Sequence, residues 1–141
     1  MTVLIIDGQG GKLGRQLVKS VSEQFPQVQI LAVGTNSAAT ANMLKGGAQR
    51  GATGENAVLV ACRSADVILG PLGIVVADSL LGEVTPAMAT AVGQSRAARI
   101  LIPINRCDNL VAGISNVPLS RLLEDAMEKL RALLEGSLIP D

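Results

Sequence analysis

The sequence predicts an α/β fold, a three-layer Rossmann-like open sheet of mostly parallel strands with helices on both faces. Short runs of valine, isoleucine and leucine alternate with segments of helical length, which is typical of strands that helices cover on both sides. A glycine-rich stretch follows the first of these runs directly. The chain has 141 residues and is 48% apolar, so we expect a single Rossmann-like domain over residues 1–141.

The first two strands and helices follow from clear start and stop signals. Residues 2–6 are expected to form the first strand, and residues 28–33 the second. Between them we expect a helix over 11–24. Its apolar stripe consists of Leu13, Leu17, Val18 and Val21. Ser37 is expected to cap a second helix that runs to about Lys45.

Residues 53–65 allow two interpretations. Thr53 can cap a helix that begins near Glu55, whereas the apolar run 57–61 would serve as a buried strand. Short apolar runs do not separate these two structures, because periodicity needs a longer window. We favour the helix, followed by a strand over 66–70.

Two short helical stretches and a further strand are expected in the third quarter of the chain. Residues 73–95 are expected to form two short helical stretches, the second starting at Thr85 with Pro86 in its first helical position. Residues 99–104 are expected to form a strand. Because helices separate successive strands, the connections are crossovers and the strands lie parallel, with their carboxyl ends at one edge. This prediction concerns the strands 2–6, 28–33, 66–70 and 99–104.

The last part of the chain is expected to contain a short strand at about 110–114 and a long helix over 118–135. Pro118 opens this helix, because proline is favoured in a first helical turn. Its apolar stripe consists of Leu119, Leu122, Leu123, Ala126, Met127, Leu130 and Leu134.

Charge and composition exclude several classes of partner. Twelve basic and twelve acidic side chains cancel, so no overall positive field attracts nucleic acid or a membrane. The apolar runs are shorter than the roughly 20 residues that cross a bilayer, and no leader precedes the first strand, so we expect a cytoplasmic protein. With no histidine and only Cys62 and Cys107, we expect neither a disulfide framework nor a zinc site, and we assign no metal ligand.

The stretch DGQGGKLG, residues 7–14, is the strongest candidate site. It contains a G-x-G-x-x-x-G variant of the dinucleotide-binding fingerprint, placed between a strand and a helix. A helix that starts there points its first N–H groups at the loop and favours a bound anion. The expected phosphate-binding residues are Gly8, Gln9, Gly10, Gly11, Lys12 and Gly14. The alternative is that the glycines only form a tight turn.

Two neighbouring features weaken the case for NAD. NAD-binding domains place an acidic residue at the end of the second strand, where this chain has Thr35, Asn36 and Ser37. We expect these three near a ribose or a 2′-phosphate, or else as a plain loop and helix cap. Asp7 would repel a pyrophosphate unless it points away or a cation intervenes. The cofactor expectation is therefore NAD(P) or another nucleotide, with the ligand left open.

Other strand ends supply further candidate binding residues. Gly70, Pro71 and Gly73 follow one strand, and Asn105 and Arg106 follow the next. Open α/β sheets bind ligands at such ends. An arginine there can hold a phosphate or carboxylate bidentately, although a solvated surface arginine needs no ligand to explain it.

No catalytic residue is identified. Cys107 is a candidate nucleophile, but without a histidine there is no ordinary base to activate it, and a buried thiol is the simpler interpretation. Glu55, Asp78 and Glu83 are each a candidate general base, or only a charge near a helix end.

The strings IDGQGGKLG, GTNSAATANMLKGGAQRGATGENAV, DVILGPLGIVVADSLLGEVTPAMA and ILIPINRC carry a resemblance that covers residues 2–114. They resemble a small family of bacterial proteins of about this length, known only as a domain of unknown function. The resemblance implies a Rossmann-like fold and a bacterial cytoplasmic protein, and it implies no catalytic residue.

These observations predict a protein that binds a nucleotide, a dinucleotide or another phosphate-bearing small molecule after the first strand. The alternative is a non-catalytic oligomeric sensor or subunit that binds a small anionic metabolite, which the missing histidine favours. A homo-oligomer, a dimer or larger, is expected because the core is aliphatic, with Phe25 its single aromatic residue. The run Ile74-Val75-Val76-Ala77 is also more apolar than a solvated helix.

Overall fold

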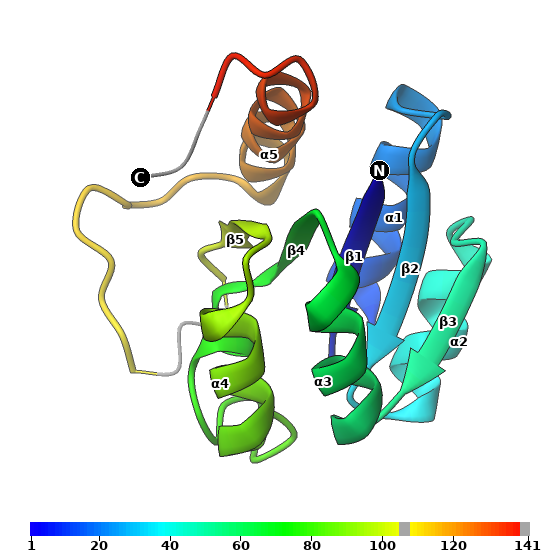
Figure 1. Ribbon diagram of the computed structural model, residues 1–141. Coiled ribbons are helices and arrows are strands. Elements are labelled where there is room, and N and C mark those ends of the chain that lie inside the picture. Colours follow the sequence, from blue (N-terminus) through cyan, green and yellow to red (C-terminus); the bar gives the residue numbers. More distant parts are fainter. Residues whose placement is uncertain (105–107, 139–141) are drawn as a thin grey trace.

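Five parallel strands form one sheet in the order β3-β2-β1-β4-β5 (Figure 1). The computed structural model describes residues 1–104 and 108–138. The strands are β1 (Thr2–Asp7), β2 (Gln29–Gly34), β3 (Arg50–Thr53), β4 (Val67–Pro71) and β5 (Ala98–Ile102). The strand order changes direction between β1 and β4, and such a switch point opens a crevice at the carboxyl ends of the strands.

Helices cover both faces of this sheet. They are α1 (Lys12–Gln24), α2 (Ser37–Lys45), α3 (Glu55–Ser64), the 3₁₀ helix η1 (Leu72–Val75), α4 (Pro86–Gln94) and α5 (Leu119–Leu134). Figure 1 shows α3 and α4 on the face toward the viewer. Residues of α1, α2 and α5 pack in one hydrophobic cluster, and residues of α3, α4 and η1 pack in the other. The expected three-layer α/β fold is confirmed.

The strand residues alternate between the two clusters. Val3 and Ile5 of β1 belong to the α1 side, whereas Leu4 and Ile6 belong to the α3 side. Successive side chains of a strand point to opposite faces, so a strand with a helical layer on each side must be apolar at every position. This explains the continuous run VLII in the sequence.

The predicted parallel pairing is confirmed for all four expected strands. β1 pairs with β2 from Thr2↔Gln29 onward and with β4 from Val3↔Val67 onward, and β4 pairs with β5. The helical interpretation of residues 53–65 is also confirmed, because α3 occupies this segment. Thr85 and Pro86 start α4 as expected, and the Thr85 hydroxyl accepts a hydrogen bond from the Met88 N–H at 3.1 Å.

Two strand assignments were wrong. Strand β3 was not predicted, because only one of its four residues is even partly buried and an edge strand of this kind carries no apolar pattern. The strand expected over 110–114 is absent from the described part of the chain. These residues form turns instead, and the Leu110 side chain is 96% exposed, so no sheet face covers it.

Several helix ends differ from the expected caps. Asn36, and not Ser37, caps α2, because its side chain accepts from the Ala39 N–H at 2.9 Å. Gly54 precedes α3 with φ of 101°, a conformation that favours glycine. Thr53 instead lies in β3, with its hydroxyl 2.7 Å from that of Thr40.

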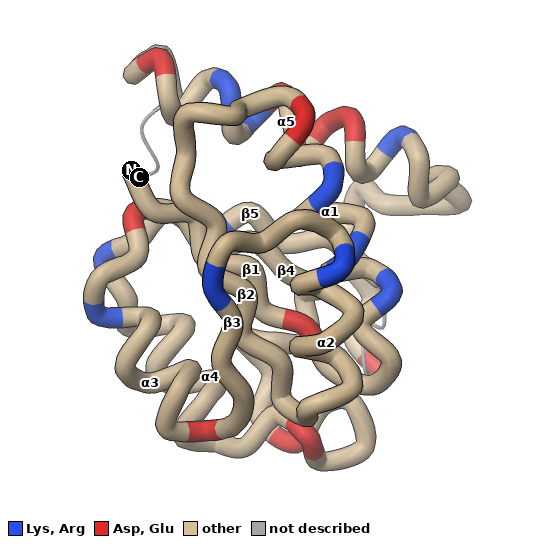
Figure 2. The backbone as a smooth tube through the Cα atoms, turned by 90° about the vertical axis from the view of Figure 1, so that its right-hand side faces the viewer, with Lys and Arg blue, Asp and Glu red and all other residues tan. Residues whose placement is uncertain are grey.

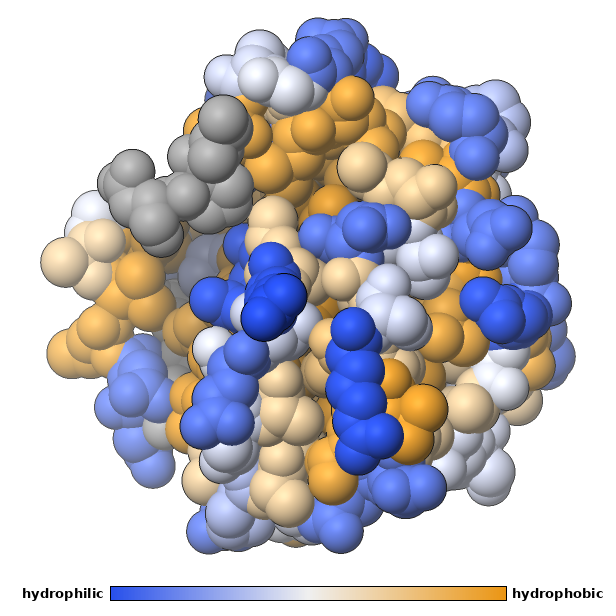
Figure 3. Space-filling model, in the orientation of Figure 1, coloured by the Kyte–Doolittle hydropathy of each residue, from blue (hydrophilic) through white to orange (hydrophobic). Residues whose placement is uncertain are grey.

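The surface leaves two leucines almost fully exposed. Leu81 and Leu110 are each 96% exposed, and Figure 3 shows hydrophobic side chains on the protruding segment at the left that Figure 1 draws in yellow. Ile74 is buried in the α3-side cluster, so the run 74–77 is only partly available for an interface. Self-association stays a prediction.

In the described residues, no helix is long and apolar enough to cross a membrane.

Candidate functional site

A cavity of about 380 Å³ opens at the switch point, at the carboxyl end of β1. Residues 7–13 form one wall, and the side chains on the other sides come from α1, from the segment after β4, and from the two ends of the β5–α5 connection. These other lining residues are Gln16, Leu80, Ile104 and Leu119. The cavity therefore lies where open α/β sheets place their ligands.

Three backbone N–H groups in this wall have no acceptor among the residues that the structure describes. Gly11 has φ of 74° and turns the chain into α1 without any side-chain cap. In the described part of the chain, the N–H groups of Gly10, Lys12 and Leu13 donate no hydrogen bond. All three residues line the cavity, and the first turn of a helix carries a partial positive charge. The wall thus presents unused donors to an anion.

The glycines of the motif have different tasks. A Cβ at Gly8 would lie 2.7 Å from the Thr35 hydroxyl, and a Cβ at Gly14 would lie 2.8 Å from the Asp7 Cβ. A Cβ at Gly11 would lie 2.8 Å from the backbone of Ala39 in α2. Of the four glycines of the motif, Gly10 alone has no described atom within 4 Å of the same position. Packing therefore explains three of these four glycines, and space for a ligand is left at Gly10.

Asp7 supports the helix start from inside the protein. Its carboxylate accepts from the Gly8 N–H at 2.8 Å and from the Gly14 N–H at 2.7 Å, and the residue is 5% exposed. Burial raises the pKa of Asp7 above its usual range, although these two hydrogen bonds lower it; the nearby Glu83 carboxylate raises it further. The expected conflict with a bound phosphate is reduced, because the carboxylate uses N–H groups other than the three free ones.

A second carboxylate closes the other side of the glycine loop. The Glu83 Oε1 atom accepts from the Gln9 N–H at 2.8 Å, from the Thr35 hydroxyl at 2.6 Å and from the Asn36 side-chain amide at 2.8 Å. Burial raises the pKa of Glu83, but these three hydrogen bonds outweigh it and hold the pKa below its usual value. Thr35 and Asn36, expected near a ribose, are therefore already engaged.

Glu83 belongs to a strained segment, residues 78–84, which we call the strap. Asp78, Leu80 and Leu81 have φ values of 66°, 55° and 56°, and non-glycine residues rarely adopt this conformation. The strap places Leu80 in the cavity wall and Glu83 over Gly8. The sequence indicates Glu83 only as a candidate base, because no local pattern connects it with the distant residues 9, 35 and 36.

The other predicted site residues are not brought to the cavity. Gly70 and Pro71 are the buried last residues of β4, and Gly73 is buried in η1, so the expected turn begins later than predicted. Ser37 is exposed at the start of α2. The candidates Asn105, Arg106 and Cys107 lie outside the described residues, although the preceding Ile104 lines the cavity.

Charges at this edge of the sheet are mainly acidic. Figure 2 shows acidic positions gathered at the lower end of the molecule, where the strands finish. Among the described lining residues, Lys12 is the one basic side chain and Asp7 the one acidic side chain. Within residues 1–104 and 108–138, no three acidic or cysteine side chains converge as a metal site.

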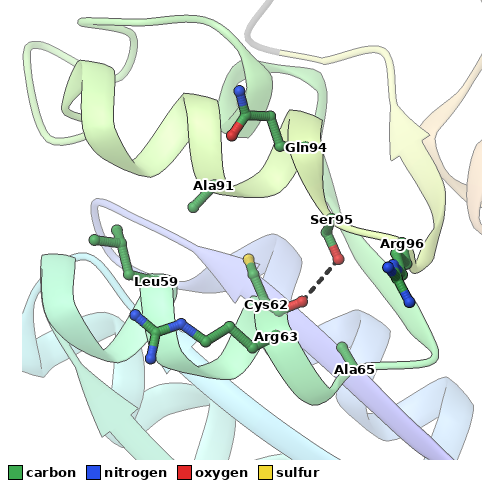
Figure 4. Close-up of a pocket in the computed structure, with 8 residues that line it drawn as sticks. All are labelled: Leu59, Cys62, Arg63, Ala65, Ala91, Gln94, Ser95 and Arg96. Atoms are coloured by element: carbon green, nitrogen blue, oxygen red, sulfur yellow. Dashed lines mark hydrogen bonds between the residues drawn. The ribbon is translucent and has the colours of Figure 1, made fainter.

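A second hollow of about 350 Å³ lies at the opposite edge, between the carboxyl ends of α3 and α4 (Figure 4). Arg63 and Arg96 line it, with their guanidinium groups at opposite sides in this view. The Ser95 hydroxyl donates to the Cys62 carbonyl at 2.8 Å, so these polar groups are already paired. Nothing in this hollow was predicted from the sequence.

Fold and cavity together define a Rossmann-like α/β protein with an anion-compatible helix start at its switch point. The chain belongs to the family described as "Domain of unknown function (DUF3842)", whose model matches residues 2–135. This confirms the family resemblance found in the sequence. No protein with a curated function matches the chain.

One similar solved structure is a dodecameric FMN-dependent Ubix-like decarboxylase from Escherichia coli O157:H7. The two chains are 18% identical with a TM-score of 0.47, over 93% of this chain and 75% of the other.

Proposed function

We propose that this protein binds a small phosphate-bearing molecule in the switch-point cavity. The observation that carries the proposal is the set of free N–H groups of Gly10, Lys12 and Leu13, all in the cavity wall. A phosphate oxygen accepts such hydrogen bonds without rearranging the backbone, because the helix start already aims them outward. The exposed Lys12 side chain adds a positive charge beside them.

The cavity suits a ligand about the size of a mononucleotide. Its volume of about 380 Å³ is near the lower end of the range for small-molecule sites, roughly 300–1,000 Å³. Leu80, Ile104 and Leu119 form an apolar wall that fits a ring or hydrocarbon part. A single phosphate at the helix start with a flat or apolar body against these side chains uses both features. We accordingly favour a mononucleotide or a similar phosphate over NAD(P).

A sensor or subunit role is the second candidate, in which ligand binding is the function and no reaction follows. It is favoured by the small number of ionisable side chains in the described cavity wall, which are Asp7 and Lys12. Asp7 already accepts two hydrogen bonds from the backbone and is needed at the helix start. General acid–base catalysis needs a group that can exchange protons with a substrate, and Asp7 is committed elsewhere.

The proposal is tested by ligand-induced stabilisation of the wild-type protein and of Gly10→Val. The panel consists of GMP, FMN, ribose 5-phosphate and inorganic phosphate, followed by thermal unfolding. At 100-fold excess over the dissociation constant, a bound ligand stabilises by about 2.7 kcal/mol. We expect at least one compound to stabilise the wild type and none to stabilise Gly10→Val, because the valine fills the open space beside the free donors.

The variant must first be shown to fold, by its circular dichroism and its unfolding temperature without ligand. An absence of stabilisation of the wild type by every compound in the panel would contradict the proposed function. Equal stabilisation of Gly10→Val would show that the ligand lies elsewhere.

A further inference from the structure

Three donors from separate parts of the chain converge on one oxygen of Glu83. They are the Gln9 N–H, the Thr35 hydroxyl and the Asn36 side-chain amide, at 2.6–2.8 Å from Oε1. We call these three donors the cradle. Such a set is what an oxyanion of a ligand would require, and here a carboxylate of the protein itself fills it.

The cradle lies beside the cavity, at the joined ends of β1 and β2. Gln9 belongs to both the cradle and the cavity wall. Dinucleotide-binding domains of this fold pass the pyrophosphate over the loop after β1 and hold a ribose at the end of β2. In this protein the same path is covered, because a Cβ at Gly8 would meet Thr35 at 2.7 Å, Leu80 at 2.9 Å and Glu83 at 3.1 Å.

The strap holds Glu83 in this place through bonds of its own. The Asp78 N–H donates to the Val84 carbonyl at 2.7 Å and closes the strap at its base, and the Ser79 hydroxyl donates to the Gly73 carbonyl. Leu80 is 5% exposed and fixes the centre of the strap against the protein. Residues at positive φ persist only where the surrounding structure holds them, so the position of Glu83 is over-determined.

We infer that Glu83 is a specificity-determining residue: its carboxylate fills the subsite next to the phosphate site and restricts the cavity to ligands with a single phosphate. This inference rests on the proposed function. At the end of β2, dinucleotide-binding domains carry an acidic residue that binds a ribose, whereas this chain has Thr35 and Asn36. The inference explains this difference, because both side chains donate to the Glu83 carboxylate of the strap. Ligands with a second phosphate are excluded because the Glu83 carboxylate already occupies the cradle, and such a block discriminates against the wrong ligand.

Two variants of Glu83 separate occupancy from charge. Glu83→Ala empties the cradle. Glu83→Gln removes the charge but leaves an oxygen that can accept from the same three donors. Glu55→Ala is the matched control, because Glu55 is a glutamate at the same edge of the sheet whose side chain accepts from Thr85 and takes no part in the cradle.

The experiment measures dissociation constants for GMP, FMN and NAD by titration calorimetry, with circular dichroism as the check on folding. The wild type is expected to bind GMP or FMN and not NAD. Glu83→Ala is expected to gain at least about tenfold in NAD affinity, the factor that corresponds to about 1.4 kcal/mol. Glu83→Gln and Glu55→Ala are expected to keep the wild-type preference.

NAD binding to the wild type would overturn the inference, because the cradle would then not exclude a second phosphate. An unchanged preference in a folded Glu83→Ala that still binds GMP or FMN would overturn it too. An equal gain in Glu83→Gln would assign the exclusion to charge repulsion and contradict occupancy. If GMP, FMN, ribose 5-phosphate and inorganic phosphate all fail to bind the wild type and every variant, the proposed function fails, and this result is distinct from the other three.

Discussion

Two hollows of nearly equal volume lie at opposite ends of the strands of the same sheet, and they differ in the polarity of the helices that line them. The switch-point cavity measures about 380 Å³ and the hollow between α3 and α4 about 350 Å³. The first is lined by the start of a helix, with free N–H groups at Gly10, Lys12 and Leu13. The second lies at the ends of two helices, where carbonyl groups carry partial negative charge.

In the second hollow, hydrogen bonds engage Ser95 and the Cys62 carbonyl. Arg99 donates to the Ser95 carbonyl at 2.8 Å, and Ser95 in turn donates to the Cys62 carbonyl. Burial raises the pKa of the Cys62 thiol, which favours its protonated form over the reactive thiolate. The difference teaches that the polarity of the helices and the unused backbone donors at a helix start identify the candidate site here, because the two volumes are nearly equal.

The largest expected effect separates two glycines of the motif beside the first hollow: Gly10, which lines the cavity, and Gly14, which packs in the core. Gly14→Val should lower the free energy of unfolding by about 3 kcal/mol, because its side chain would overlap Asp7 and Met43 in the core. Gly10→Val should change it by less than about 0.5 kcal/mol, because its side chain meets open space. Urea unfolding of both variants measures the difference. Similar losses at both positions would contradict the division of tasks among the glycines.

A smaller effect concerns the carboxylates around the first hollow. The pKa of Asp7 is raised by burial and also by Glu83, so Glu83→Gln should lower it toward 3.8. Because the pKa of Asp7 is raised in the folded state, protonation of Asp7 stabilises the folded protein. This contribution to the free energy of unfolding is fully present at pH below 3.8 and is lost as the pH rises through the folded pKa. Carbon-13 NMR titration of the carboxyl groups measures this shift. An Asp7 pKa that stays unchanged in Glu83→Gln would show that the two groups do not interact.

The sequence was sufficient for the parts of the fold that depend on local pattern. The runs VLII and VIL are apolar at every position because both faces of β1 and β4 are covered, and the stripe of α5 packs on the sheet. Strand β3 could not be predicted, because the residues RGAT lie at the edge of the sheet and their side chains are mostly exposed. The caps at Asn36 and Gly54 were each predicted one residue away. Asn36 and Ser37 are both favoured N-cap residues, and the positive φ of Gly54 is not visible in the sequence.

The candidate site was only half predictable for a similar reason. Gly10, Gly11 and Lys12 line the cavity as the motif suggests, because loop and helix are adjacent in sequence. The cradle joins Glu83 to Gln9 and Thr35 across long separations in the chain, and only the folded sheet edge brings them together. The strap's positive φ values likewise leave no signature, because leucine is unusual in that conformation.

The central claim is that the start of α1, and not the hollow between α3 and α4, binds a phosphate. It is tested most directly by following backbone amide signals in nitrogen-15 NMR spectra while GMP, FMN or inorganic phosphate is added. The account predicts the largest shifts at Gly10, Lys12 and Leu13, whose N–H groups are free, and no shift at Arg63 or Arg96. Shifts centred on Arg63 and Arg96, or none at Gly10, Lys12 and Leu13 with any of the three compounds, would contradict it.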